Sequence, residues 1–185
     1  LCFCFYCEGE GGVTMGLYDL LGEKKSIILK TWFDVLLQSY PSDTSGFLRK
    51  QERQFSNPVG YTFSQGLEGL LDELFSTQEM DFLRISPLLD SIIRIRAVQD
   101  LTPSQALAFI FHLKKIIRDE VGHPETVVSG EMPELESRID ALALVAFDLY
   151  MKCREKIYDL KANEVRDRTY RLLQRAHLIN DGQEQ

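Results

Sequence analysis

Apolar residues recur at helical spacing along most of the chain, and alternation of period two, expected for a strand, nowhere lasts more than a few residues. From Lys24 to Tyr40 the apolar positions share one helical face, and Pro41 ends the run. A polar bridge follows, in which residues 47–53 are expected to form a short helix, and the stripe from Phe63 to Leu74 marks another long one. The pattern predicts an all-α fold of five or six helices.

Two proline-containing caps predict where the next helices begin. Ser86 followed by Pro87 suits an N-cap with proline at the first helical position, where its missing N–H costs nothing. Residues 102–105, Thr-Pro-Ser-Gln, form a capping box, and the helix that they open is expected to end at Gly122. Because residues 106–111 of that helix are apolar on every side, we expect neighbouring elements to cover it all round.

The last helical stretch runs from Pro133 to about His177 without a further glycine or proline. A helix of that length reaches roughly 65 Å at 1.5 Å per residue, which is longer than a domain of this size is wide. The helix therefore either breaks along its length or projects beyond the domain. Its first half is expected to pack in the core, whereas the second half is richly charged. This second half is expected to be an arm for dimerisation or partner binding, with its sparse apolar positions at Ile157, Leu160, Val165 and Leu172.

The charge balance excludes some classes of partner. A net charge of -7 argues against a general nucleic-acid or anionic-membrane binder, because both need a basic surface. A helix-turn-helix around residues 99–105 is also unsuited to reading DNA, since its second helix presents Leu107, Phe109 and Phe111 where polar side chains are needed. No apolar run approaches the roughly 18 residues that a membrane span requires.

The cysteines do not form a disulfide framework. Cys2, Cys4 and Cys7 crowd the first seven residues and Cys153 stands alone, so we expect a reducing compartment and a cytoplasmic location. The C-x-C-x-x-C spacing lacks a fourth metal ligand nearby, which argues against a metal knuckle.

Residues 1–14 are expected to be a translated leader or an extension. The chain starts at Leu1, whereas Met15 is followed by an ordinary amphipathic beginning. Residues 8–12, Glu-Gly-Glu-Gly-Gly, correspond to the purine-rich codons of a bacterial ribosome-binding site. We therefore leave this segment out of the fold prediction.

No catalytic or phosphate-binding motif is present in the sequence. Cys153 lies between Lys152 and Arg154, and a reactive cysteine with a pKa lowered by these cations is one interpretation. No second catalytic residue accompanies it, so we expect a structural or incidental cysteine. His112 allows two interpretations. It is either a haem ligand in a helical pocket or a histidine on the polar side of its helix beside Lys114. We expect no cofactor, with haem as the alternative.

Two groups of residues are not fully explained by the packing of apolar side chains in a core. One contains Phe55 and Asn57, which we interpret as the turn and cap that start a helix. The other is "IIRIRAVQD", in which Arg94 and Arg96 point to different helical faces and lie close to Gln99. At least one of these arginines is expected to be partly buried and paired with an acid; the candidate partners are Glu52, Glu68 and Asp72.

Together, "FSNPVGYTFSQGLEGLLDEL" and "IIRIRAVQDLTPSQALAFIFHLKKIIRDEV" resemble the N-terminal domain of RsbRD-type RsbT co-antagonists, relatives of the stressosome protein RsbR. The resemblance covers roughly residues 24 to 160. It implies a haem-free, globin-like helical sensor that dimerises and is often followed by a helical linker and a STAS domain that engages the RsbT kinase. It implies signal input rather than catalysis. A STAS domain does not fit before Gln185, which places kinase antagonism in doubt.

The expected organisation is a leader at residues 1–14, a helical domain at 15–160, and an arm with a short tail at 161–185. The expected function is a non-enzymatic, homodimeric sensory or protein-interaction module of bacterial signalling, with an unknown signalling or redox protein as partner. The alternative is a haem-based gas or redox sensor. The candidate pocket residues are Phe55, Asn57, Arg94, Arg96, Gln99, Phe109 and His112.

Overall fold

The computed structural model describes residues 16–49, 55–99, 101–122, 130–176 and 178. Within these ranges the secondary structure is entirely helical, which confirms the all-α prediction. The six helices are α1 (Leu17–Leu37), α2 (Ser42–Leu48), α3 (Pro58–Leu74), α4 (Phe82–Val98), α5 (Pro103–Val121) and α6 (Glu131–Arg175).

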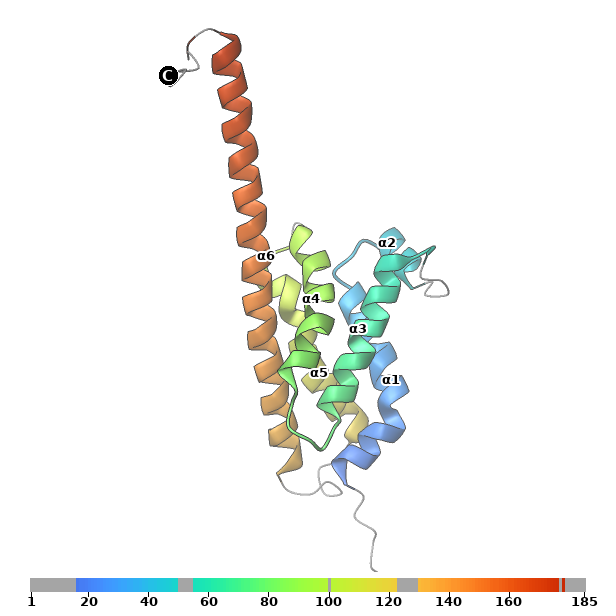
Figure 1. Ribbon diagram of the computed structural model, residues 1–185. Coiled ribbons are helices and arrows are strands. Elements are labelled where there is room, and N and C mark those ends of the chain that lie inside the picture. The colour runs from blue at the N-terminus through green and yellow to red at the C-terminus, as the bar shows by residue number, and fades with distance from the viewer. Residues whose placement is uncertain (1–15, 50–54, 100, 123–129, 177, 179–185) are drawn as a thin grey trace, which may run out of the picture.

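Five of the helices form a closed bundle. Going round it, the neighbours are α6, α4, α3, α1 and α5, and α5 packs against α6 to close the ring. Figure 1 shows α6 at one side of this bundle and running well beyond it. The enclosed core is almost wholly apolar and contains Trp32, Phe63, Ile92, Ile110 and Leu142, none of them measurably exposed. Burial of these side chains is the main stabilising contribution to the bundle.

The helices near the N-terminus differ in extent from the prediction. α1 begins at Leu17, seven residues before the predicted Lys24, because Leu17 and Leu21 are also buried in the core. α2 covers Ser42–Leu48, whereas the short helix had been predicted over residues 47–53. The last four of those residues lie outside the described ranges.

Asn57 fixes the start of α3. Its side chain is 1% exposed, and its Oδ1 accepts the backbone N–H of Gly60 at 2.9 Å, which makes it the N-cap. Its Nδ2 donates to the carbonyls of Phe47 and Leu48, both at 3.0 Å, at the end of α2. A Cβ at Gly60 would overlap Asn57 Nδ2 and the Leu48 carbonyl, so glycine is required there. The segment therefore joins two helix ends.

We expect Asn57→Asp to lower the free energy of unfolding by about 3 kcal/mol at pH 7. Aspartate keeps the cap acceptor, but it places a buried carboxylate oxygen against the Phe47 and Leu48 carbonyls. Urea denaturation at pH 7 and pH 5 measures the effect, and the loss should shrink at the lower pH as the carboxylate takes up a proton. Asp81→Asn, at the exposed N-cap of α4, is the control and should change stability by less than about 1 kcal/mol. Equal losses in both variants would contradict the double role of Asn57.

The predicted start of α4 at Ser86 is wrong. The helix begins at Phe82, and the side chain of Asp81 caps it by accepting the N–H of Leu83 at 2.9 Å. Pro87 consequently lies inside the helix. The earlier start brings Ile85 into the core, where it is fully buried. The carboxylate cap and this burial outweigh the proline signal that the sequence offers.

The capping box that starts α5 is confirmed, with Thr102 and Gln105 each accepting the other's backbone N–H. The helix ends before Gly122, whose φ of 75° is in the left-handed region that favours glycine. The prediction that neighbours cover residues 106–111 all round is wrong. Phe111 is 52% exposed, because α5 packs mainly between α1 and α6 and leaves one face open.

α6 is one continuous helix of 45 residues. The last of its buried residues is Tyr150, and from Tyr158 to Arg175 every side chain is exposed except the half-buried Leu173. We call residues 158–175 the arm. It extends about 27 Å at 1.5 Å per residue, and Figure 1 shows it leaving the bundle as a straight continuation of α6. Of the two alternatives that its length allows, the helix projects rather than breaks.

Candidate functional site

Arg96 is a charged side chain inside the core and is 1% exposed. Its Nε donates to the carbonyl of Ala106 at 2.7 Å, and one terminal nitrogen donates to the carbonyl of Gln105 at 2.9 Å. The other terminal nitrogen donates to the hydroxyl of Ser39 at 3.1 Å. These bonds join the last turn of α4 to the first turns of α5 and to the end of α1.

Arg96 has no acidic partner among the described residues. None of the carboxylates in the described ranges lies within ion-pair distance of it. Burial lowers the pKa of Arg96 below its ordinary value. The three hydrogen bonds and the carbonyl end of α4 are the polar groups that stabilise the guanidinium.

Aromatic rings surround the guanidinium. Its central carbon lies 5.3 Å from the ring centre of Phe109 and 5.8 Å from that of Tyr40, distances at which a cation and a ring attract. The Tyr40 hydroxyl is buried beside Arg96 and Gln99, and it makes no hydrogen bond within the described part of the chain. Burial raises the pKa of Tyr40. The fold therefore keeps a cation and an unpaired hydroxyl side by side away from water.

A cleft of about 250 Å³ reaches this group of residues. Its lining combines apolar side chains from three segments with a few polar ones, and Arg96 is its only buried cation among the described residues. The lining residues are Val35, Gln38, Ser39, Arg96, Leu101, Gln105, Ala108, Phe109 and His112.

The structure brings together only some of the predicted pocket residues. Arg96, Phe109 and His112 line the cleft, and Gln99 lies beside Tyr40 behind it. Phe55 is 98% exposed and does not line it. Asn57 is the cap of α3, as the sequence interpretation held.

The expectation for the two arginines is partly correct. Arg96 is the buried member of the pair, whereas Arg94 is exposed and pairs with Asp90 at 2.6 Å. Two of the three predicted acidic partners are wrong, because Arg96 bonds to two carbonyls and a hydroxyl. Asp72 pairs with Lys25 instead, and Glu68 accepts from Gln65. Glu52 lies outside the described residues.

Sequence reasoning missed Ser39, Tyr40 and the backbone of Gln105. Ser39 and Tyr40 follow the end of α1, and Gln105 contributes its carbonyl, which has no signature in a sequence. The one available signal was the predicted burial of an arginine, since a buried guanidinium must find acceptors.

His112 and Cys153 are the remaining chemical candidates. His112 is exposed and lines the cleft, whereas Lys114 faces α6, where it pairs with Asp140. The pKa of Cys153 is raised above its ordinary value, mainly by burial and further by Asp90, whereas Arg94 lowers it. No group of three potential metal ligands occurs among the residues that the structure describes.

Exposed apolar side chains follow α6 at intervals of seven residues. Leu144, Met151, Tyr158, Val165 and Leu172 are 70%, 37%, 57%, 64% and 58% exposed, respectively. At about 100° per residue these five positions share one helical face. The small residues Ala162 and Thr169 lie between them in the arm, which gives the alternating spacing of four and three found in coiled coils. We call this face the α6 seam.

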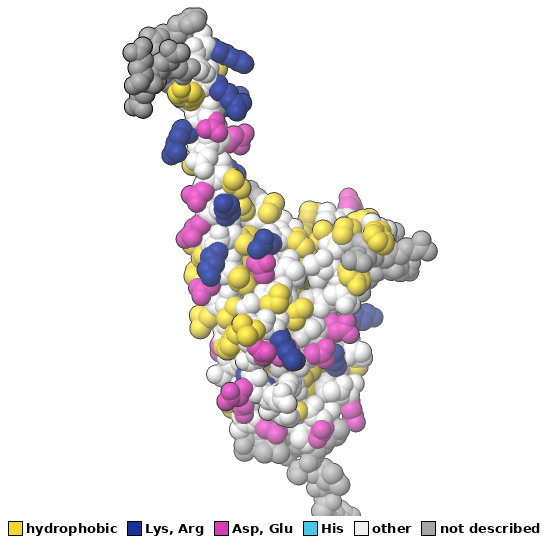
Figure 2. All heavy atoms as spheres, in the orientation of Figure 1, with side chains coloured by type: hydrophobic (Ala, Val, Ile, Leu, Met, Phe, Trp, Pro, Cys, Tyr) yellow, Lys and Arg dark blue, Asp and Glu magenta, His cyan; other side chains and the backbone are white. Residues whose placement is uncertain are grey.

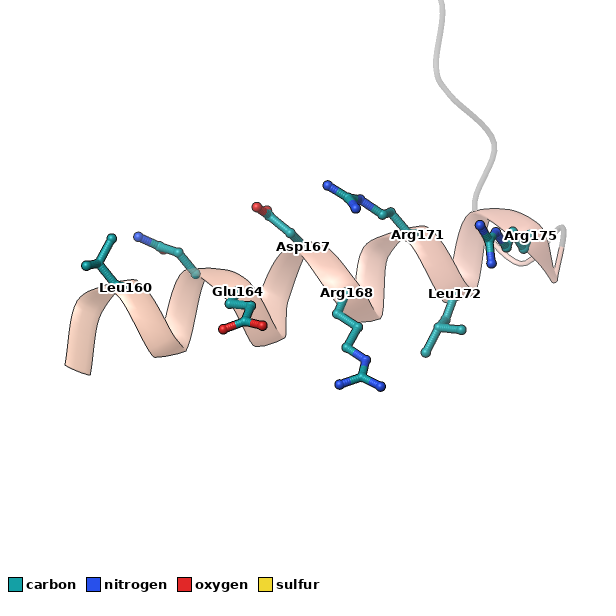
Figure 3. Close-up of a pocket in the computed structure, with 8 residues that line it drawn as sticks. Leu160, Glu164, Asp167, Arg168, Arg171, Leu172 and Arg175 are labelled. Carbon is teal, nitrogen blue, oxygen red and sulfur yellow. The ribbon is translucent and has the colours of Figure 1, made fainter. Parts of the chain in front are cut away.

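The four apolar arm residues predicted from the sequence do not share one face. Val165 and Leu172 belong to the seam, whereas Leu160 lies about 200° around the helix from Tyr158. Ile157 is half-buried and lines a groove against α4 together with Val98. Figure 3 shows the side chains of the arm pointing away from a single helix in several directions, so they enclose no cavity of their own.

Charged residues of both signs flank the seam. Figure 2 shows them along the arm with apolar side chains between them. Arg154, Lys161, Arg168 and Arg175 recur every seven residues, three positions after each of four seam residues. One border of the seam is therefore basic.

α6 also contacts the last turn of α4 and Leu101, which lines the cleft. The Tyr150 hydroxyl donates to the carbonyl of Leu101 at 3.0 Å, and Arg154 donates to the carbonyl of Ala97 at 3.1 Å. Met151 and Tyr158 of the seam border the connection between α4 and α5. The wall of the cleft is thus hydrogen-bonded to α6 close to where the arm begins.

A search for membrane spans among the described helices found none that is both long and apolar enough.

Comparisons with known proteins gave two matches. A family model described as "RsbT co-antagonist protein rsbRD N-terminal domain" matches residues 27–165. A protein of Archaeoglobus fulgidus named "Uncharacterized protein" is 24% identical over 141 residues, which cover 74% of this chain and 82% of that protein. No solved structure matches the chain.

Proposed function

Since the chain belongs to the family of RsbT co-antagonist rsbRD N-terminal domains, which is a regulatory family, we propose that it is a non-enzymatic, homodimeric sensory module of bacterial signalling. It acts in the cytoplasm, without a cofactor, on a signalling or redox protein. Binding at the helical body changes the position or pairing of α6, and the arm passes this change to the partner.

The observation that carries the proposal is the α6 seam. Apolar side chains that are more than half exposed at Leu144, Tyr158, Val165 and Leu172 are costly on a lone helix in water. Their seven-residue repeat is the pattern that a second helix covers in a coiled coil. Because the repeat continues from the bundle into the arm, one interface serves both parts.

The α4–α5 connection supports the relay. A change in the cleft that moves Leu101 acts on Tyr150 through the bond between its carbonyl and the Tyr150 hydroxyl. Arg154 makes the parallel contact to Ala97 one turn further along α6. Since α6 is continuous, a rotation at this level reaches the end of the arm.

Cysteine cross-linking tests the dimer that the proposal requires. Cys2, Cys4, Cys7 and Cys153 are first replaced by serine, and Leu172→Cys is then compared with Leu160→Cys. Both leucines are 58% exposed and belong to the arm, but they occupy different faces of α6. In a parallel pair, seam positions at the same level lie close enough for a disulfide.

We expect rapid formation of a covalent dimer by Leu172→Cys and slow formation by Leu160→Cys. Equal rates at the two positions would contradict pairing through the seam. The haem alternative predicts a Soret band in the absorption spectrum of the purified protein. Such a band would contradict the proposal that the protein acts without a cofactor.

A further inference from the structure

We propose that the cleft at Arg96 binds a small organic monocarboxylate. Its carboxylate meets the guanidinium and Ser39, and its compact apolar body lies against Leu101 and Phe109. That this acid is the signal relayed to α6 rests on the function proposed above.

The charge of Arg96 is not compensated by an acid within the described residues. A guanidinium that is 1% exposed ordinarily faces a carboxylate, because a buried charge is costly without an opposite charge. Arg96 has only neutral partners in the described part of the chain. An anion in the adjoining cleft supplies the missing negative charge.

Arg96 has more hydrogen-bond donors than its three hydrogen bonds use. A guanidinium carries five N–H groups, and three are used in the bonds to Ala106, Gln105 and Ser39. Two remain, one on each terminal nitrogen. The unpaired hydroxyl of Tyr40 lies beside them. A planar carboxylate, with two acceptor oxygens, suits donors arranged in this way.

The size and lining of the cleft narrow the choice of anion. A volume of about 250 Å³ is below the roughly 300–1,000 Å³ of sites for drug-sized ligands. Val35, Leu101, Ala108 and Phe109 make part of its lining apolar, and Arg96 is the one cation there. A phosphate dianion requires more positive charge and more hydrogen-bond donors than this lining provides. A monocarboxylate with a compact apolar body matches both the single guanidinium and the apolar side chains.

Titration with benzoate, with benzamide as its neutral counterpart, tests the proposal on the full chain labelled with nitrogen-15. We expect benzoate to shift the Arg96 Nε–H signal and the amide signals of Ser39, Leu101 and Phe109 with saturation. Benzamide and inorganic phosphate should leave them unchanged. Failure of benzoate to saturate these signals, or equal shifts with benzamide, would overturn the proposal.

Three variants locate the binding. Arg96→Met should weaken benzoate binding at least about tenfold, whereas Arg94→Met, at an exposed arginine on the same helix, should leave it unchanged. Ala108→Phe fills the cleft and keeps the guanidinium. If Arg96→Met fails to fold, this variant still tests whether benzoate binds in the cleft. Benzoate binding that survives in Ala108→Phe would place the ligand elsewhere and overturn the proposal.

Light scattering on the same samples separates this inference from the proposed function. A dimer that does not bind benzoate overturns the monocarboxylate site alone. A monomer that binds benzoate at Arg96 supports the site and overturns the homodimeric module.

Discussion

Replacing Trp32 with alanine is expected to lower the free energy of unfolding by about 3–5 kcal/mol, the usual cost of removing a large aromatic side chain from a core. Trp32 is fully buried and its ring lies 6.0 Å from that of Phe109. Its indole N–H donates to the Phe109 carbonyl at 2.7 Å, so the variant loses both packing and a bond between α1 and α5. Urea denaturation followed by circular dichroism measures the loss, since the variant has no tryptophan left for fluorescence.

Two further variants show how much of this loss in unfolding free energy comes from the indole N–H and how much from the buried ring. Trp32→Phe keeps an aromatic ring but removes the N–H donor, and we expect it to lose less, about 1–3 kcal/mol. Thr31→Ala changes an exposed neighbour on α1 and should stay within about 0.5 kcal/mol of the wild type. A Trp32→Ala loss no larger than that of Thr31→Ala would contradict the core described above.

Replacing Leu172 with lysine is expected to weaken the homodimer on the order of 10²- to 10⁴-fold. Burial of a leucine side chain contributes about 1.5–3 kcal/mol, and the change occurs in both chains. The new ammonium group also adds repulsion beside the basic border formed by Arg168 and Arg175. Sedimentation equilibrium over a range of concentrations gives the dissociation constant.

Leu160→Lys is the matched control for this change. It replaces the same residue type at the same 58% exposure on a different face of the arm, and we expect less than about a threefold effect. A similar weakening by both variants would indicate a general effect of charge on the arm rather than loss of the seam.

The charges beside the seam predict a weak salt dependence. In a parallel pair with the seam at its centre, Lys161 of one chain faces Arg166 of the other, where like charges repel, and Arg154 faces Asp159, where opposite charges attract. Added salt screens both interactions. The dissociation constant from sedimentation equilibrium is therefore expected to change little with ionic strength, whereas a large rise would indicate an interface held by surface ion pairs.

The sequence predicted most of the bundle because its helices carry strong local signals. The α5 capping box, the Asn57 cap and the apolar stripe of α3 each depend on residues only a few positions apart. α4 was misplaced where two local signals competed, since Asp81 and Ser86-Pro87 are both good starts and only the burial of Ile85 decides between them. The open face at Phe111 depends on which helices pack against α5, which no local pattern contains.

The candidate site was predictable only in part, because it also depends on contacts between residues that are far apart in the chain. The pattern indicated a buried arginine among residues 94 and 96, and Phe109 and His112, which were grouped with it, line the same cleft. The acceptors of Arg96 were not predictable, because two are backbone carbonyls and Ser39 is 57 positions away in the chain. The seam was partly visible in Val165 and Leu172, but its continuation through Leu144 and Met151 needed the exposure of each side chain.

The central claim is that α6 pairs with a second copy of itself through the seam, and the mass of the wild-type chain in solution tests it most directly. Sedimentation equilibrium at micromolar concentrations should give twice the chain mass of 21.3 kDa, and Leu172→Lys should return it to the single-chain value. A wild-type chain that stays at the single-chain mass up to about 100 µM, which corresponds to a binding free energy weaker than about -5.5 kcal/mol, would contradict the account.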